Sequence, residues 1–299
     1  MNLESNDRKR WIEKTLEVFS FFIKLCEDYR LTYFIAYGSA IGTIRHHGFI
    51  PWDDDIDVIM PRPDYERLVH IFRKEDMGRY ELVTATNTPN YYLPFTKLCD
   101  KTTTVYEDTS YRCVIGVFID IFVLDGIINN PDKIEETGRC YEKYWRMFLL
   151  ANSYYTITDI FNRFIMKKRI RIILKYVKYS FNRKKYSNQA IKRLEELTQQ
   201  YDYSQCEYVV KNPRMSGNRD IFPKAWFEDK VMMPFESLQV AIPFMYHHWL
   251  SHIYGNYMQL PPEDQRISNH TFVYYNLDRR LELNEVLDEV KRMDKLNKK

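Results

Sequence analysis

Apolar and polar positions along the chain predict both helices and strands. Across residues 10–30, apolar side chains recur every three or four residues, the spacing of an amphipathic helix. Residues 61–73 begin with a proline, which favours the first turn of another helix. Short apolar runs typical of strands lie at 31–36, 80–85, 93–99 and 114–124. The last run, VIGVFIDIFVL, is the most hydrophobic in the chain and predicts a buried central strand.

One stretch, residues 37–60, combines such patterns with a dense set of polar groups and reads YGSAIGTIRHHGFIPWDDDIDVIM. Side chains alternate between the two faces of a strand, so Asp55 and Asp57 should share one face, while Ile56 and Val58 fill the other. Two carboxylates at this spacing can bind one hard divalent cation, or two close together, through oxygen. The stretch therefore predicts a site for Mg²⁺ or Mn²⁺ that holds the phosphates of a nucleotide.

The acidic run has two other possible interpretations. An acidic surface turn is the ordinary alternative, but apolar or aromatic residues bound this run on both sides instead of Gly, Ser or Lys. A calcium-binding loop starting at Asp53 needs Gly at its sixth position and Glu at its twelfth. The chain has Val58 and Asp64 there, so the calcium loop is excluded.

Polar groups near the acidic run are candidates for phosphate binding. A turn at Gly38 and Ser39 would let backbone amides approach an anion, and the Ser39 hydroxyl can donate to phosphate. A helix should begin at Ala40, behind this turn. Lys97 lies among apolar neighbours in the 93–99 strand. Its amine either reaches water at the strand edge or places a positive charge on the phosphates.

Asp120 lies in the middle of the hydrophobic 114–124 run. A buried, unpaired carboxylate costs several kcal/mol or takes up a proton, so it needs a cation or strong donors. A structural partner such as a buried arginine would satisfy it. A third metal ligand opposite Asp55 and Asp57 is the interpretation favoured here. Asp125, just past the run, is interpreted as a cap of the next turn.

The order of these features resembles the nucleotidyltransferase superfold: Gly-Ser, then Asp-x-Asp on a strand, then an acid on a later strand. More narrowly, RHHGFIPWDDDID (45–57) is similar to the LicD family, bacterial phosphocholine transferases related to the fukutin-type ribitol-phosphate transferases. The resemblance covers most of 33–126 and much of 235–270, and it is thin between them. Its closing motifs lie at 235–236, 242–243 and 254–266, followed by His270.

This resemblance implies an α+β fold, with a mixed nucleotidyltransferase-like sheet flanked by helices. The expected parts are a catalytic core at 1–130, a helical insertion at 131–205, and a C-terminal part at 206–299 that completes the core. The implied donor is a CDP-alcohol, usually CDP-choline, whose phospho-alcohol moves to a hydroxyl of a glycan such as lipopolysaccharide or a teichoic-acid precursor. The sequence alone assigns no aromatic cage for a quaternary ammonium among its 24 tyrosines and 5 tryptophans.

The mechanism expected from the residues and the resemblance is metal-dependent phosphoryl transfer. Asp55, Asp57 and Asp120 hold the Mg²⁺ or Mn²⁺, and Asp120 or Asp53 is the general base for the acceptor hydroxyl. The groups assigned to phosphate binding are Gly38, Ser39, Lys97 and Arg45. Two alternatives stay open: a nucleotidyltransferase that attaches NMP and releases pyrophosphate, and a catalytically silent, membrane-bound scaffold.

The amino-acid composition indicates the kind of protein and its cellular compartment. The chain has 299 residues and is 45% hydrophobic, enough for a substantial core. Its five cysteines are odd in number and lack CxxC spacing, which supports neither a zinc site nor a disulfide framework, so a reducing cytoplasm is expected. No apolar run suggests a signal peptide or a membrane-spanning helix.

Basic residues are concentrated in one segment. Residues 163–186 contain ten Lys or Arg and no acid, so removing these charges from the total of +3 leaves about −7 elsewhere. Apolar residues recur among them, a pattern that suits the surface of an anionic bilayer, where each cation adds about 1 kcal/mol. A solvated helix packed on the core is the plain alternative. No nucleic-acid partner is expected, because nothing resembles a base-reading module. We expect a cytoplasmic protein that contacts the membrane peripherally.

Overall fold

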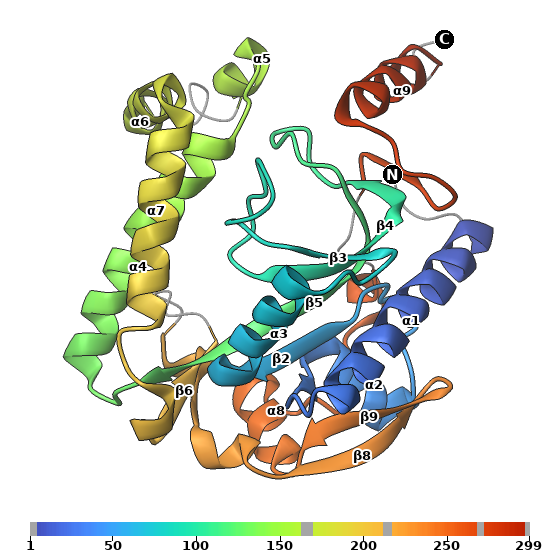
Figure 1. The fold of residues 1–299 in the computed structure, drawn as a ribbon, viewed down its shortest axis with the longest axis vertical. Helices are drawn as coiled ribbons and strands as arrows, with labels where there is room; N and C mark the ends of the chain where they lie inside the picture. The colour runs from blue at the N-terminus through green and yellow to red at the C-terminus, as the bar shows by residue number, and fades with distance from the viewer. Residues whose placement is uncertain (1–4, 163–169, 212–216, 268–271, 297–299) are drawn as a thin grey trace.

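The computed structural model describes residues 5–162, 170–211, 217–267 and 272–296 (Figure 1). A curled mixed sheet with the strand order β1-β2-β5-β4-β10 forms the centre, β3 extends it beside β4, and β6 and β7 extend it beside β5. Helices flank the sheet, so the predicted α+β class is confirmed. The strands are β1 (Phe34–Ile35), β2 (Asp57–Pro61), β3 (Tyr80–Val83), β4 (Thr96–Tyr106), β5 (Ile115–Ile127), β6 (Tyr208–Val210), β7 (Ile221–Pro223) and β10 (Tyr274–Asn276).

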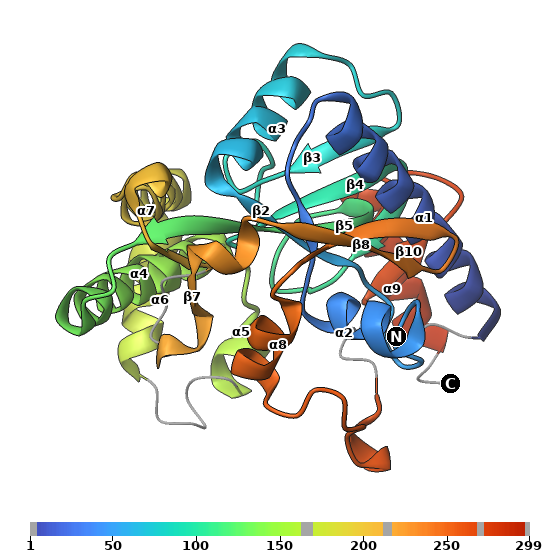
Figure 2. The same cartoon turned by 90° about the horizontal axis from the view of Figure 1, so that it is seen from below.

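Helices cover both faces of this sheet. In Figure 2, α1 and α3 lie on one side of it, and α2 and α8 lie on the other. A separate two-stranded hairpin packs against β1 and lies at the bottom of Figure 1. Its strands are β8 (Lys230–Phe235) and β9 (Leu238–Pro243). The helices are α1 (Ser5–Asp28), α2 (Tyr37–His46), α3 (Arg62–Lys74), α4 (Pro131–Asn152), α5 (Ile157–Ile160), α6 (Ile170–Phe181), α7 (Arg183–Thr198), α8 (Tyr246–Tyr254) and α9 (Leu283–Leu296).

The main core joins segments from both ends of the chain. Phe34 of β1 and Ile59 of β2 are fully buried in the same apolar cluster as Phe235 of β8 and Trp249 of α8. Burial at this scale is the main favourable term in folding, so these distant segments stabilise one another. The C-terminal residues therefore pack directly against the strands that carry the acidic run.

The helices of the middle region have a core of their own. Tyr141, Trp145 and Phe148 of α4 pack against Ala190 and Leu194 of α7. Figure 1 shows α4, α6 and α7 standing together at one side of the sheet. No helix in the described ranges is both long enough and apolar enough to cross a lipid bilayer.

Several predicted boundaries were wrong. Gly38 and Ser39 belong to the first turn of α2 and not to a turn before it. The strand predicted at 93–99 starts at Thr96 and runs on to Tyr106. Asp125 lies inside β5, where it forms an ion pair, and so does not cap a turn. The α8 helix ends at Tyr254, and Gly255 follows it with φ +67°.

Candidate active site

Strand register places three polar side chains in one row across the sheet. Asp57 of β2 lies opposite Asp120 of β5 in a parallel pair, and Asp120 lies opposite Lys97 of β4 in an antiparallel pair. Directly opposed residues point to the same face of a sheet, so the three side chains are neighbours. The central position predicted for the 114–124 run is confirmed, because β5 lies between β2 and β4.

The acidic run brings a further carboxylate, that of Asp55, close to this row. Asp55 lies two residues before Asp57, where β2 begins, so it precedes the strand in which it was predicted. Ligand oxygens of Asp55, Asp57 and Asp120 nevertheless lie within 4.8 Å of one another. Ile56 and Val58 are fully buried between these acids, as the alternation predicted. A slip of one residue would expose both apolar side chains, so packing holds the register.

The three carboxylates repel one another when ionised, and a bound cation would compensate that repulsion. Burial raises the pKa of Asp57 well above its ordinary value, and the charges of Asp55 and Asp120 raise it further. Burial also raises the pKa of Asp120 to about 6, although Lys97 opposes that rise. Clustered carboxylate oxygens are the donor set that hard divalent cations prefer. The geometry therefore fits a Mg²⁺ or Mn²⁺ ion.

Lys97 is buried and paired. Its Nζ donates to Asp120 Oδ1 at 2.8 Å and lies 3.5 Å from Glu107 Oε1. Only 2% of its side chain is exposed, so the interpretation of a lysine reaching water at the strand edge is wrong. Its ammonium also lies 3.2 Å from the centre of the Phe118 ring. Asp120 thus has a buried cationic partner, as its position required. The partner is a lysine, whereas the sequence suggested an arginine.

Gly38 and Ser39 connect α2 to the acidic run. A Cβ at Gly38 would meet Asp53 Oδ2 at 2.7 Å, so glycine allows that carboxylate to approach the helix. Ser39 Oγ accepts from the Asp57 amide at 2.9 Å and donates to the Asp55 carbonyl at 3.5 Å. The serine therefore anchors the start of β2, and its predicted contact with phosphate remains a prediction. The first amides of α2 have no side-chain cap, and such amides favour anions.

Comparison with known proteins agrees with this geometry. Residues 30–130 match the family described as LicD/FKTN/FKRP, nucleotidyltransferase domain. Over 258 residues the chain is 31% identical to the lipopolysaccharide cholinephosphotransferase LicD of Haemophilus influenzae, and the match covers 85% of this chain and 92% of that protein. The chain belongs to the LicD family. The resemblance predicted from the acidic run is therefore confirmed.

In this LicD-family protein, Arg45 has contacts that the sequence did not reveal. Its Nη1 donates to the carbonyl oxygens of Tyr257 and Gln259, at 3.0 and 3.4 Å. Arg45 therefore ties α2 to the segment after α8. A contact between Arg45 and phosphate stays a prediction.

Sequence reasoning missed Lys211, which follows β6 directly. Its Nζ lies 4.0 Å from the centre of the Tyr37 ring and 4.3 Å from that of Phe122. Burial lowers the pKa of this lysine, whereas the negative charges of Asp220, Asp57 and Asp120 act in the opposite direction. Within the described part of the LicD-family chain, its ammonium has no hydrogen bond or ion pair. The only sequence signal was a lysine after the apolar pair Val209-Val210.

Tyr37 was also missed, although it opens the acidic stretch. Its backbone has φ +48, a left-handed conformation that is strained for a side chain of this size. Its hydroxyl is buried and has no hydrogen-bond partner among the described residues. Strain and an unsatisfied buried group are typical of functional sites. Tyr37, whose ring lies against the Lys211 ammonium, is therefore a candidate site residue.

Proposed function

We propose that this protein is a Mg²⁺-dependent phosphotransferase that moves phosphocholine, or a related phospho-alcohol, from a CDP-alcohol to a hydroxyl of a cell-surface glycan. The observation that carries the proposal is the cluster of Asp55, Asp57 and Asp120 within 4.8 Å. The transferred group and a lipopolysaccharide acceptor are suggested by the name of the Haemophilus influenzae relative. A teichoic-acid precursor would present the same kind of hydroxyl.

Asp55, Asp57 and Asp120 would hold the metal ion, and Mn²⁺ is the alternative to Mg²⁺. When bound, the ion neutralises charge on the pyrophosphate and on the departing CMP. Lys97 keeps Asp120 ionised, since its charge opposes the rise of the Asp120 pKa. These residues form a negatively charged site for a cation, and the bound cation would in turn hold the phosphates of the donor.

Other residues of the chain would hold the donor and activate the acceptor. Lys211 is placed to bind a phosphate oxygen, because its ammonium faces Asp57 and Asp120 without a direct partner among the described residues. The first amides of α2 offer a second anion contact. Lys97 stays with Asp120 in this scheme, and Arg45 supports the loop after α8.

Asp53 is our choice for the general base. Asp120 is already engaged by Lys97, whereas the Asp53 carboxylate lies beside the N-terminus of α2 next to Gly38. Asp53 takes the proton of the acceptor hydroxyl. The acceptor oxygen then bonds to the phosphorus that carries the alcohol, the phosphorus–oxygen bond to CMP breaks, and CMP leaves.

The test uses the purified protein with Mg²⁺ and a panel of CDP-choline, CDP-ethanolamine, CDP-glycerol, CDP-ribitol, CTP and ATP. We expect selective, Mg²⁺-dependent binding of one CDP-alcohol and release of CMP when glycan is added. Pyrophosphate release from CTP or ATP would instead identify a nucleotidyltransferase. A complete lack of Mg²⁺-dependent nucleotide binding would favour the silent scaffold.

We also propose that α6 contacts an anionic bilayer surface. Part of the predicted basic segment, 163–169, lies outside the described residues, but α6 itself is described. It carries Arg171, Lys175 and Lys178 beside an exposed apolar stripe at helical spacing. The stripe consists of Ile170, Leu174, Val177 and Phe181, whose exposed fractions are 64, 67, 57 and 94%.

Vesicle flotation tests this contact. The protein should float with vesicles that contain phosphatidylglycerol and not with pure phosphatidylcholine vesicles, and high salt should weaken the binding. Leu174→Asp should abolish flotation without changing nucleotide binding. Equal flotation of Leu174→Asp and the parent protein would contradict the proposal.

A further inference from the structure

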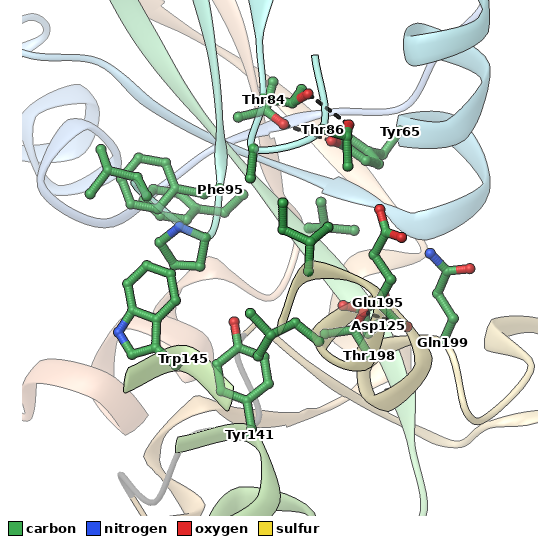
Figure 3. A pocket seen from close by; sticks show the side chains of 18 of the residues that line it. Tyr65, Thr84, Thr86, Phe95, Asp125, Tyr141, Trp145, Glu195, Thr198 and Gln199 are labelled. Atoms are coloured by element: carbon green, nitrogen blue, oxygen red, sulfur yellow. Dashed lines mark hydrogen bonds between the residues drawn. The ribbon is translucent and has the colours of Figure 1, made fainter. Parts of the chain in front are cut away.

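A cavity of about 160 Å³ lies between the sheet and the middle helices (Figure 3). The α3 helix, the start of β4 and the middle of β5 form one side, and α4 and α7 form the other. Six aromatic side chains line it: Tyr65, Phe95, Phe122, Tyr141, Trp145 and Phe148. A cavity lined by so many rings is a typical site for a small organic group.

The cavity lies near the acidic site, and Phe122 and Lys211 connect the two. Phe122 follows Asp120 by two residues in β5, roughly 7 Å along the strand, and lines the cavity. The ring centres of Phe122 and Phe95 are 4.6 Å apart. Lys211 lines the cavity as well, and its ammonium lies 4.3 Å from the centre of the Phe122 ring. The cavity is therefore within reach of a group whose phosphate is bound between Lys211 and the acidic site.

Charged residues of both signs line the cavity. Arg62 and Asp125 neutralise each other in an ion pair of 2.6 Å. Lys211 is close enough to Asp57 and Asp120 for their negative charges to act on its ammonium. Glu195 of α7 lies at the exposed rim, and its carboxylate has no hydrogen bond or ion pair in the described ranges. Figure 3 shows Phe95 and Trp145 on one side of the cavity and Glu195 on the other.

We propose that this cavity binds the quaternary ammonium of the donor, an inference that rests on the proposed function. Aromatic faces attract quaternary ammonium ions, and a carboxylate at the rim adds to that attraction. Lys211 would meet the phosphate of the same phosphocholine group. Trp145, Tyr141 and Glu195 come from α4 and α7, outside the family match at 30–130. The middle helices thus set which alcohol is accepted.

The experiment compares binding of CDP-choline, CDP-ethanolamine, CDP-glycerol and CMP by calorimetry with Mg²⁺ present. The parent protein should prefer CDP-choline. Trp145→Leu should weaken CDP-choline binding about tenfold and leave CMP binding unchanged. Glu195→Gln, a change at an exposed position that cannot disturb the core, should weaken CDP-choline binding several-fold and again spare CMP.

Matched control variants distinguish the loss of a cavity contact from a general effect of substitution on binding. Glu196 is exposed on the same helix and pairs with Arg193 at 2.5 Å, so Glu196→Gln should bind like the parent. Trp226 packs beside His252 away from the cavity, and Trp226→Leu should keep the preference for CDP-choline.

The two proposals fail in different ways. An unchanged preference for CDP-choline in both Trp145→Leu and Glu195→Gln would overturn the cavity assignment and leave the proposed function standing. If the parent protein binds CDP-choline no better than CMP, the proposed donor is wrong and the cavity assignment is overturned with it. If Trp145→Leu unfolds, Glu195→Gln still decides the question.

Discussion

The ammonium of Lys97 lies 2.8 Å from the carboxylate of Asp120, and both side chains are buried at the centre of the sheet. The pair sits at the end of a row that also contains Asp57. A buried charge is tolerated when it is paired and hydrogen-bonded. Lys97 therefore stabilises the acidic site, because its positive charge compensates the negative charge of one of the three clustered carboxylates.

Lys97→Met should leave Asp120 without its counter-charge. We expect a loss of about 3–5 kcal/mol in the free energy of unfolding, the usual cost of breaking a buried pair. Adding Asp120→Asn should recover part of that loss, because no uncompensated charge remains. Urea unfolding measures both variants. Lys101→Met, at an exposed position of the same strand, should change stability by less than about 0.5 kcal/mol. Equal stability of the single and double variants would contradict this account.

Asp57→Asn should lower transfer at least about a hundredfold, because it removes a metal ligand. The metal-free variant should also be more stable than the parent at neutral pH. Burial and two neighbouring acids raise the pKa of Asp57, so its ionised form is disfavoured in the folded state. Asn removes that cost. Circular dichroism melting in EDTA and a CMP-release assay measure the two effects. Exposed Asp76 is the control, since Asp76→Asn should alter neither.

Binding of Mg²⁺ should weaken as the pH is lowered through about 6, the pKa to which burial raises Asp120. The sign follows from the ligand chemistry, because protons compete with the ion for the same carboxylate and the proton-bound form gains population below that pKa. Calorimetric titration of the metal-free protein on either side of this pH measures the effect. An affinity that does not change over this range would contradict the assignment of Asp120 as a ligand.

Gly38→Ala should impair transfer more than folding. The added methyl group would lie 2.7 Å from Asp53 Oδ2, so the carboxylate must move. Alanine is better than glycine in a helix by roughly 1 kcal/mol, which offsets part of the steric cost to stability. Combining Gly38→Ala with Asp53→Ala should relieve the clash and restore the melting temperature while transfer stays low. Full activity of Gly38→Ala would remove Asp53 from its proposed role as base.

Lys211→Met should weaken binding of CDP-choline about tenfold without lowering stability. The ammonium is largely buried with a lowered pKa and has no partner in the part of the chain that is described, so removing it costs the free protein little. Calorimetry and thermal melting measure the two quantities. Lys230→Met, at an exposed position on β8, is the matched control and should bind like the parent. Unchanged affinity in Lys211→Met would exclude a phosphate contact.

The sequence alone predicted the mixed fold, the buried central strand and the acidic cluster. These features depend on local patterns: Ile56 and Val58 alternate with Asp55 and Asp57, and a single acid interrupts the apolar run around Asp120. A side chain's face in a strand follows from its parity, so the local pattern was enough to place Asp55 and Asp57 together. The approach of Asp120 depends in addition on the parallel pairing of β2 and β5. The order of residues in the acidic run was also specific enough to predict the family.

Only the tertiary structure decided which groups surround that cluster. The pairing of Lys97 with Asp120 depends on the register between two strands, and Lys211 reaches the site only because β6 pairs with β5. The aromatic cavity needs α4 and α7 to pack beside α3 and the start of β4. Contacts between segments far apart in the chain are set by the packing of the whole core, and no local period in the sequence encodes them.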